Sequence, residues 1–164
     1  MFRAAAAAVM ALFVLALAEP ASAQKAVFVV RHAERADQTS NSPLSAEGRS
    51  RAESLARLLK DAGVSGIFVS QFQRTAQTAQ PLASMLGVTP TVVPAAGTSV
   101  LVEEIRAVDA GKSAVVVGHS DTVPAILKAL GCVEEVTVNT DEFDRLFIVI
   151  PGAGPKPVLL ELHY

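Results

Sequence analysis

The sequence alternates short runs of β-branched, apolar residues with longer amphipathic stretches, and this alternation is what most constrains the fold. Residues 114–117, for example, are four consecutive apolar residues, which indicates a strand buried on both faces. An alternation of strands and helices is typical of βα units built around a parallel sheet. We therefore predict an α/β protein of three layers, with a mostly parallel central sheet between two layers of helices (α/β/α), and a C-terminal hairpin.

The expected elements follow one another closely. Strands are predicted at residues 27–30, 67–69, 92–93 and 114–117, and helices at residues 44–60, 72–86, 99–109 and 122–130. Gly63, Gly87 and Gly111 are the expected stops of the first three helices. Ser45 or a neighbour is expected to cap the first helix. Pro81 is expected to kink or split the second helix, because proline lacks a backbone N–H and clashes with the preceding turn. Residues 146–150 and 158–162 are expected to form the closing hairpin.

Residues 1–23 are predicted to be a secretory signal peptide. Arg3 supplies a positive charge, residues 4–18 form an apolar core, and Ala21-Ser22-Ala23 is a small-residue cleavage site. An uncleaved membrane anchor is the alternative, but the apolar core is shorter than the roughly 20 residues that span a bilayer. We expect cleavage, no stable membrane span afterwards, and one mature domain, residues 24–164, in the periplasm or outside the cell.

Composition argues against two further classes of protein. The formal net charge is −2 and no block of like charge occurs, so the sequence lacks the basic footprint of a nucleic-acid-binding protein. Cys132 is the single cysteine, which excludes an internal disulfide. Its apolar neighbours favour a small buried side chain over a reactive thiol. Stability is therefore expected to come from packing.

Functional side chains follow three of the predicted strands. Arg31 and His32 come directly after the first strand. Ser70 and then Arg74 follow the second, and His119 follows the strand at residues 114–117. Ligands of open α/β sheets bind outside the carboxyl ends of the strands. Two arginines and two histidines are therefore expected to converge at one edge of the sheet.

This set of residues suits phosphoryl transfer. Arginine presents a planar fork of donors that fits phosphate oxygens and stays charged. A neutral histidine has a nitrogen lone pair that can attack phosphorus. A second histidine can donate a hydrogen bond to the transferring group, over whose oxygens the charge is spread. The chemistry requires no cofactor and no metal, and two flanking arginines disfavour a bound cation.

Four motifs occur in an order that resembles the histidine phosphatase superfamily, which includes the phosphoglycerate mutases. They are Val30-Arg31-His32-Ala33-Glu34, Pro43-Leu44-Ser45-Ala46-Glu47-Gly48, Ser70 with Arg74-Thr75-Ala76-Gln77-Thr78-Ala79, and Gly118-His119-Ser120. The resemblance implies a compact phosphatase-type domain in which His32 is phosphorylated. It also implies that Arg31 and Arg74 clamp the phosphate and that His119 is the second pocket histidine.

The sequence departs from the family pattern at two positions. Many members have glycine where this chain has Ala33, and alanine is small enough to let the loop approach a phosphate. Many also have an asparagine near Gln38, for which a solvated loop position is the preferred interpretation.

The general acid is left open. Hydrolysis of an alkyl phosphate needs an acid that protonates the departing oxygen. Asp121 is one candidate, and its alternative role is to cap the helix that follows His119.

Two other carboxylate positions are also candidates for the acid. Glu34 follows the nucleophile closely, and its alternative is an ion pair with Arg35 or Arg31. Glu103 and Glu104 form the last position, for which a solvated helix face is the preferred interpretation.

Two different functions fit parts of the sequence. Gly118-His119-Ser120-Asp121-Thr122 resembles the nucleophile elbow of serine hydrolases, with Asp141 or Asp144 and then His163 as partners of Ser120. That alternative leaves the two arginines and the first histidine unexplained. A non-catalytic module that binds phosphate or a phosphorylated ligand is the other alternative, although both histidines of the catalytic pattern are present.

We therefore predict a phosphatase that hydrolyses a phosphomonoester through a phosphohistidine on His32. A mutase normally carries insertions that cap a highly charged substrate, and the connections in this chain are short. The substrate's identity and the oligomeric state are left open. The expected ligand is a small phosphoester or inorganic phosphate outside the cytoplasm.

Overall fold

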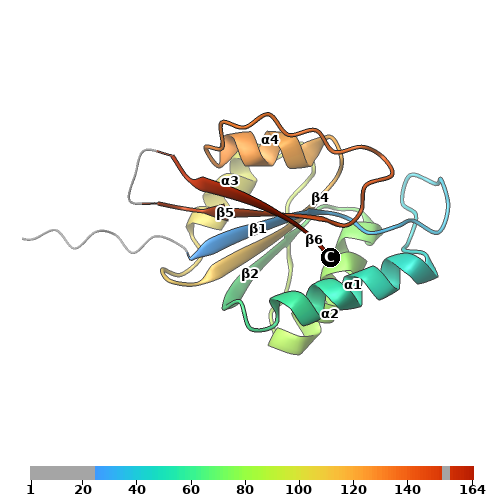
Figure 1. The fold of residues 1–164 in the computed structure, drawn as a ribbon. Coiled ribbons are helices and arrows are strands. Elements are labelled where there is room, and N and C mark those ends of the chain that lie inside the picture. Colours follow the sequence, from blue (N-terminus) through green and yellow to red (C-terminus); the bar gives the residue numbers. More distant parts are fainter. Residues whose placement is uncertain (1–24, 153–155) are drawn as a thin grey trace, which may run out of the picture.

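The computed structural model describes residues 25–152 and 156–164 (Figure 1). The predicted signal peptide and residues 153–155 of the hairpin turn lie outside the described residues. The strands are β1 (Ala26–Arg31), β2 (Val64–Val69), β3 (Thr91–Val92), β4 (Ser113–Gly118), β5 (Arg145–Ile150) and β6 (Val158–His163). The helices are α1 (Ala46–Leu59), α2 (Gln73–Leu86), α3 (Thr98–Arg106) and α4 (Thr122–Ala129). None of these helices has the length and hydropathy of a membrane span.

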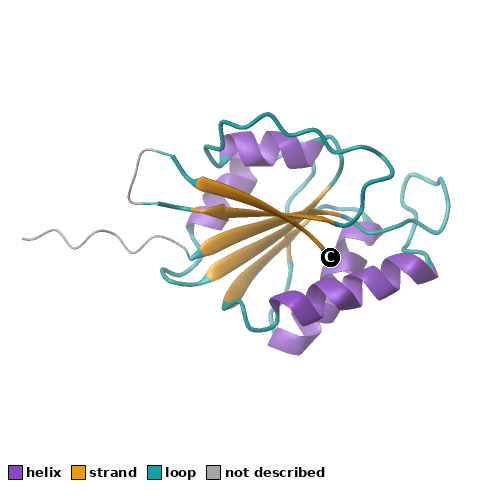
Figure 2. Cartoon of the chain, in the orientation of Figure 1, coloured by secondary structure: helices purple, strands orange, loops and turns teal. Residues whose placement is uncertain are grey.

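The strands form one sheet in the order β3-β2-β4-β1-β5-β6 (Figure 2). β3, β2, β4 and β1 are parallel, β5 is antiparallel to β1, and β6 is antiparallel to β5. The predicted mostly parallel sheet with a closing hairpin is confirmed. The register pairs Arg31 with Gly118 and Val69 with Val117. The carboxyl ends of β1, β2 and β4 therefore meet at one edge, called the carboxyl edge below.

Helices cover both faces of the sheet, with α1 and α2 on one side and α3 and α4 on the other (Figure 1). Every residue of β1 and β4 is buried, because alternate side chains point into the two layers. Val30 packs in the same core as Leu55 of α1 and Leu82 of α2. Val29 packs in the core that contains Ile105 of α3. Each fully buried aliphatic side chain contributes about 1.5–3 kcal/mol, so these two cores hold the carboxyl edge rigidly.

The helix ends follow the sequence signals, with two differences. Ser45 caps α1 by accepting a hydrogen bond at 3.0 Å from the N–H of Gly48, and Gly87 ends α2 with a left-handed φ of 66°. Of the kink or split predicted at Pro81, the split does not occur, because α2 is continuous from Gln73 to Leu86. Buried residues on both sides of the proline, Ala79 and Leu82, hold the helix against the sheet.

The other difference is at the end of α3, which stops at Arg106 rather than at residue 109. The N–H of Ala107 is shared between the carbonyls of Glu103 and Glu104, and that of Val108 bonds to Ile105. These tighter bonds close the helix early, before Gly111.

Candidate active site

An open cavity of about 710 Å³ lies at the carboxyl edge. Its walls come from the loops that follow β1, β2, β3 and β4 and from the segment between α4 and β5. The lining residues are Arg31, His32, Glu34, Arg35, Gln38, Phe72, Arg74, Ala95, His119, Ser120, Asp121, Thr140 and Phe143. The structure thus brings together all six residues predicted for the catalytic site, and the parallel strand order explains why they meet.

His32 lies directly after β1 and is only 4 % exposed. Its Nδ1 is 2.8 Å from the carbonyl oxygen of Ala33. A carbonyl oxygen only accepts, so Nδ1 carries the proton and Nε2 keeps its lone pair. Burial lowers the pKa of His32 to about 3; the Ala33 bond acts in the opposite direction, and the charges of Arg31, His119 and Arg74 add to the lowering. His32 is therefore a neutral base near neutral pH.

The loop that carries His32 is fixed by α1 and α2. The N–H of Ala33 donates to Oγ1 of Thr78 at 3.0 Å, and that hydroxyl donates to the carbonyl of Arg74 at 2.7 Å. Gly48 of α1 packs so closely that a Cβ there would lie 2.3 Å from the carbonyl oxygen of Glu34. The motif Pro43–Gly48 and the Thr78 position therefore place the loop that carries His32, called the His32 loop below, relative to α2.

Arg31 and Arg74 are held by backbone carbonyls rather than by carboxylates. Nη1 of Arg31 donates to Asn139 at 3.0 Å and to Glu142 at 3.1 Å, and Nη1 of Arg74 donates to Ser40 at 2.8 Å. The Nε atoms of both arginines are buried and make no hydrogen bond within the described part of the chain. Burial lowers the pKa of both groups. A buried and a half-buried cation, each with a buried Nε donor that has no partner in the described residues, form a site that an anion would stabilise.

Two phenylalanines support these arginines. The guanidinium carbon of Arg31 lies 4.0 Å from the ring centroid of Phe143, and that of Arg74 lies 4.3 Å from the ring of Phe72. Each such cation–π contact contributes about 0.5–2 kcal/mol. Neither aromatic residue was predicted from the sequence to lie in the site, and nor was Thr140. Phe143 and Thr140 belong to an irregular segment without periodicity, and no motif marks them.

His119 lies directly after β4, beside the first histidine. Its ring centroid is 5.2 Å from that of His32, and the two rings are arranged edge to face. Its Nε2 is 2.9 Å from Oγ of Ser70, and its Nδ1 is 3.4 Å from Nη2 of Arg74. Burial lowers the pKa of His119 to about 4, with Arg74 adding to the effect and Asp121 opposing it. Both histidines are therefore neutral in the free protein near pH 7.

The Asp121 side chain lines the cavity and makes no hydrogen bond or ion pair within the part of the chain that the structure describes. It occupies the N-cap position of α4, but its carboxylate makes no capping hydrogen bond. The alternative prediction that Asp121 caps the helix is therefore wrong. The exposed carboxylate lines the cavity instead, where it can reach a bound ligand.

Glu34 forms an ion pair with Arg51, whose Nη2 lies 2.6 Å from Oε1. The predicted pairing with Arg35 or Arg31 is wrong. The close approach of Gly48 to the His32 loop brings the next turn of α1, with Arg51, against Glu34. Oε2 of Glu34 is buried and has no partner within the described residues.

The remaining carboxylate candidates lie elsewhere. Glu103 and Glu104 are exposed on α3 and do not line the cavity, so the solvated helix face predicted for them is confirmed. Gln38 lies in an exposed loop at the mouth of the cavity, where its Oε1 accepts from Arg35 at 2.6 Å. Cys132 is buried, as predicted. In residues 25–152 and 156–164, no group of three His, Cys, Asp or Glu residues is arranged to hold a metal ion.

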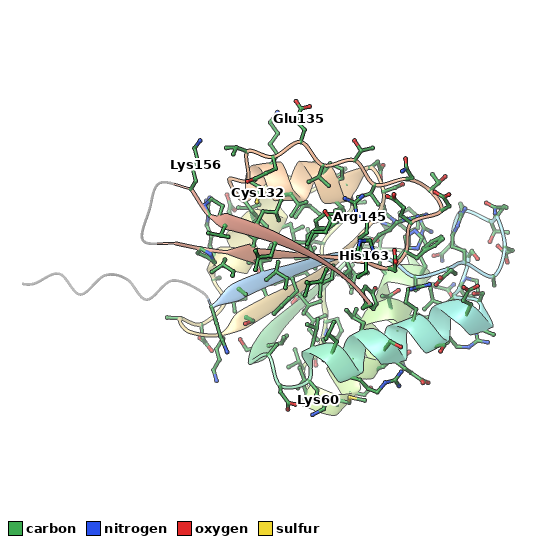
Figure 3. The ribbon with its side chains drawn as sticks, viewed as in Figure 1. Lys60, Cys132, Glu135, Arg145, Lys156 and His163 are labelled. Carbon is green, nitrogen blue, oxygen red and sulfur yellow. The ribbon has the colours of Figure 1, made fainter. Side chains whose placement is uncertain are left out.

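The serine hydrolase alternative does not assemble in this structure. Ser120 lines the cavity, but no histidine forms a hydrogen bond with it among the described residues. His163 instead contacts Asp144 at 3.0 Å, outside the cavity. His163 and Arg145 lie together at this end of the hairpin (Figure 3).

Comparison with known proteins agrees with the geometry. Residues 27–96 match the model of the histidine phosphatase superfamily (branch 1). No curated protein matches the chain. The structure resembles that of the protein histidine phosphatase SixA complexed with tungstate, with a TM-score of 0.69, 21% identity, and coverage of 84% of this chain and 96% of that one.

Two further solved structures share the fold. The protein assigned as SixA in Agrobacterium tumefaciens has a TM-score of 0.64 and 24% identity, over 84% of this chain and 97% of that one. A mycobacterial glucosyl-3-phosphoglycerate phosphatase in complex with inorganic phosphate has a TM-score of 0.67 and 15% identity, over 85% of this chain and 96% of that one.

Proposed function

We propose that this chain, which belongs to the histidine phosphatase superfamily, is a phosphatase that hydrolyses a phosphomonoester through a phosphohistidine on His32. The observation that carries the proposal is the pairing of two features at one cavity. His32 is buried and neutral with its lone pair on Nε2, and the two adjacent arginines have buried Nε donors without a protein partner. An anion that binds the arginines is thereby presented to a nucleophile.

The phosphoryl group would bind between the two arginines. Arg31 and Arg74 supply the donors for its oxygens, and their charges favour the dianion. The phosphatase neighbours support an oxyanion ligand, because one binds tungstate and another binds inorganic phosphate. A small phosphoester or inorganic phosphate is therefore the proposed ligand.

The first chemical step is attack of Nε2 of His32 on phosphorus. The N–P bond forms as the bond from phosphorus to the ester oxygen breaks, and the departing oxygen takes the electron pair of that bond. The Ala33 carbonyl holds the proton on Nδ1 and so stabilises the positive charge that the ring acquires. His119 faces the same space and can donate a hydrogen bond to the equatorial oxygens.

Asp121 is the proposed acid for the leaving group. Its carboxyl lines the cavity and has no hydrogen-bonding role in the helix, whereas Glu34 is held by Arg51. A protonated Asp121 would give its proton to the departing alkoxide, and the resulting carboxylate would then take a proton from water. That water attacks phosphorus, breaks the N–P bond and releases inorganic phosphate.

Hydrolysis is favoured over transfer to a second substrate because the cavity is open. Water can reach the phosphohistidine at the carboxyl edge, through a mouth formed by short loops. We also propose, from the predicted signal peptide at residues 1–23, that the enzyme is exported and acts on a phosphoester in the periplasm or outside the cell.

A trapping experiment tests the proposed intermediate. The mature chain is mixed with a ³²P-labelled phosphoester, quenched rapidly and examined for label that is labile in acid and stable in base. His32→Ala is expected to lose both label and turnover. His163→Ala is the matched control, because His163 lies outside the cavity, and it is expected to keep both. Label that persists in His32→Ala would contradict the proposal.

Two further assays on the wild-type protein distinguish a phosphatase from a binding module and from a serine hydrolase. Tight phosphate binding without turnover on a broad panel of phosphoesters would indicate the binding module. Inactivation by a fluorophosphonate, directed at serine, would indicate the hydrolase elbow at Ser120.

The role of the acid is tested by Asp121→Asn, which is expected to lower kcat on an alkyl phosphate by about 10²-fold. The loss should be much smaller on p-nitrophenyl phosphate, whose leaving group needs no proton.

A further inference from the structure

We propose that Ser70 is a positioning residue for the reaction, holding His119 so that Nδ1 faces the phosphoryl site and Nε2 faces the protein interior. This inference rests on the proposed phosphatase function. Ser70 lies immediately after β2 and is 6% exposed, between the sheet and the first turn of α2. It lines no part of the main cavity, so it acts only through His119.

The hydrogen bonds define which nitrogen of His119 carries the proton. The guanidinium of Arg74 can only donate, and its Nη2 lies 3.4 Å from Nδ1. Nδ1 is therefore the acceptor in the free protein, and the proton of the neutral ring is on Nε2. That N–H points to Oγ of Ser70 at 2.9 Å, which accepts it. The ring is thus held at both nitrogens.

Ser70 is itself fixed by Thr75 of α2. Oγ1 of Thr75 accepts from the N–H of Ser70 at 3.1 Å, lies 3.0 Å from Oγ of Ser70, and donates to the carbonyl of Phe72 at 2.8 Å. Thr75 is fully buried. The hydroxyl of Ser70 can therefore donate to Thr75 while it accepts from His119, so every donor in the chain from His119 to Phe72 has an acceptor.

The arrangement has a consequence when phosphate binds. The phosphate oxygens would draw Arg74 away from Nδ1, because an anion is a better acceptor for a guanidinium than a ring nitrogen at 3.4 Å. Nδ1 can then take a proton and donate to phosphate, while Nε2 continues to donate to Ser70. The charged groups that face His119 are Arg74 from α2, Arg31 from β1 and Asp121 at the start of α4, and a phosphate dianion offsets the two arginines.

Nitrogen NMR of the histidine rings tests the inference in the free protein. The wild type is expected to show His119 with its proton on Nε2, and Ser70→Ala is expected to show a mixture of both tautomers. Saturating inorganic phosphate should produce the doubly protonated ring in the wild type and less of it in Ser70→Ala. A wild-type ring with its proton on Nδ1 in the free protein, or identical spectra in the two proteins, would overturn the proposal.

Kinetics provide the second measurement. Ser70→Ala is expected to lower kcat about 10-fold to 100-fold, with KM changed less than threefold, because the arginines still bind the phosphate. Thr75→Val should have a smaller effect of the same kind, and Thr75→Ser, which keeps the hydroxyl, should retain wild-type kcat. Ser113→Ala is the control: Ser113 is a fully buried serine at the opposite end of β4, bonded to the carbonyl of Ala62. It should leave kcat unchanged.

The outcomes separate this inference from the proposed function. A wild type without turnover on any phosphoester would contradict the phosphatase, while the spectra of the free protein would still decide the position of the His119 proton. A wild type with turnover, together with a Ser70→Ala variant within twofold of it, would leave the phosphatase standing and overturn the role of Ser70.

Discussion

Two arginines of the cavity, Arg31 and Arg74, and two half-buried arginines outside it, Arg51 and Arg145 (the outer arginines), are stabilised in opposite ways. Arg31 and Arg74 have no carboxylate partner within 4 Å in the described part of the chain, and burial lowers the pKa of both. Arg51 is paired with Glu34, and Arg145 with Glu142 and Glu161. These carboxylates raise the pKa of both arginines.

The two kinds of arginine differ in purpose: the paired ones stabilise the fold, and those of the cavity remain available to a ligand. Arg51 joins α1 to the His32 loop, and Arg145 joins β5 to β6, so each outer arginine connects two segments. Arg31 and Arg74 are held instead by the backbone carbonyls of Asn139, Glu142 and Ser40, and no carboxylate of the described residues lies within 4 Å of either. If Arg31 and Arg74 served stability alone, carboxylate partners would be expected beside them. Their unpaired state is consistent with a site that waits for an anionic ligand.

Replacing a cavity arginine should give the largest effect, and the effect should fall on catalysis. Arg74→Gln is expected to lower kcat/KM about 10³-fold, which corresponds to about 4 kcal/mol, because it removes donors to the transferring group. The free energy of unfolding should fall by at most about 2 kcal/mol, because the substitution removes the contact with Phe72 and the bond to the Ser40 carbonyl but also a partly desolvated charge without a carboxylate partner. Steady-state kinetics and urea unfolding measure the two quantities. A stability loss comparable to the activity loss would break the comparison.

Replacing an outer arginine should do the reverse. Arg51→Ala leaves Glu34 half-buried without its partner and is expected to lower the free energy of unfolding by about 3 kcal/mol. The matched control is Arg57→Ala, which removes an exposed pair with Glu53 and should cost less than about 0.5 kcal/mol. Urea unfolding curves of the three proteins measure the difference; equal losses for the two variants would count against a structural role for Arg51.

Inorganic phosphate should raise the free energy of unfolding by binding the cavity arginines, and the outer arginines should play no part in this gain. A concentration 100 times its Kd is expected to add about 2.7 kcal/mol to the free energy of unfolding of the wild type. Arg145→Ala should retain this gain, and Arg74→Gln should lose most of it. Thermal unfolding with and without phosphate provides the measurement. A gain that survives in Arg74→Gln would place the anion elsewhere.

The pH dependence of stability should report the buried histidines. The pKa values of His32 and His119, about 3 and about 4, lie below the unfolded value near 6.5. Because the unfolded chain binds the protons first, stability is present above pH 6.5 and is lost as pH falls toward 4. Each histidine is expected to cost about 2 kcal/mol between pH 7 and pH 5. His119→Ala should remove about half of that loss; an unchanged pH dependence would argue against a buried, neutral His119.

The strands and the four principal site residues could be predicted because each depends on local pattern. Continuous apolar runs mark β1 and β4, and Arg31, His32 and His119 follow directly where such runs end. Arg74 is the second residue of the next helix, α2. The parallel order of the strands then brings these residues together without further information.

Other features depend on contacts between distant segments and could not be predicted. The partner of Glu34 is set by how α1 packs on the His32 loop, and Phe143 reaches Arg31 from an irregular segment far along the sequence. The split expected at Pro81 does not occur, because α2 is held against the sheet by buried residues on both sides of the proline. Local sequence propensity carries no information about such contacts between distant segments.

The position of the phosphoryl group on the ring of His32 tests the central claim most directly. The Ala33 carbonyl holds the proton on Nδ1, so only Nε2 has a lone pair for attack. Phosphoenzyme trapped at alkaline pH and examined by ³¹P and ¹⁵N NMR is predicted to carry phosphorus on Nε2 of His32. Phosphorus on Nδ1, or on any residue other than His32, would contradict the account.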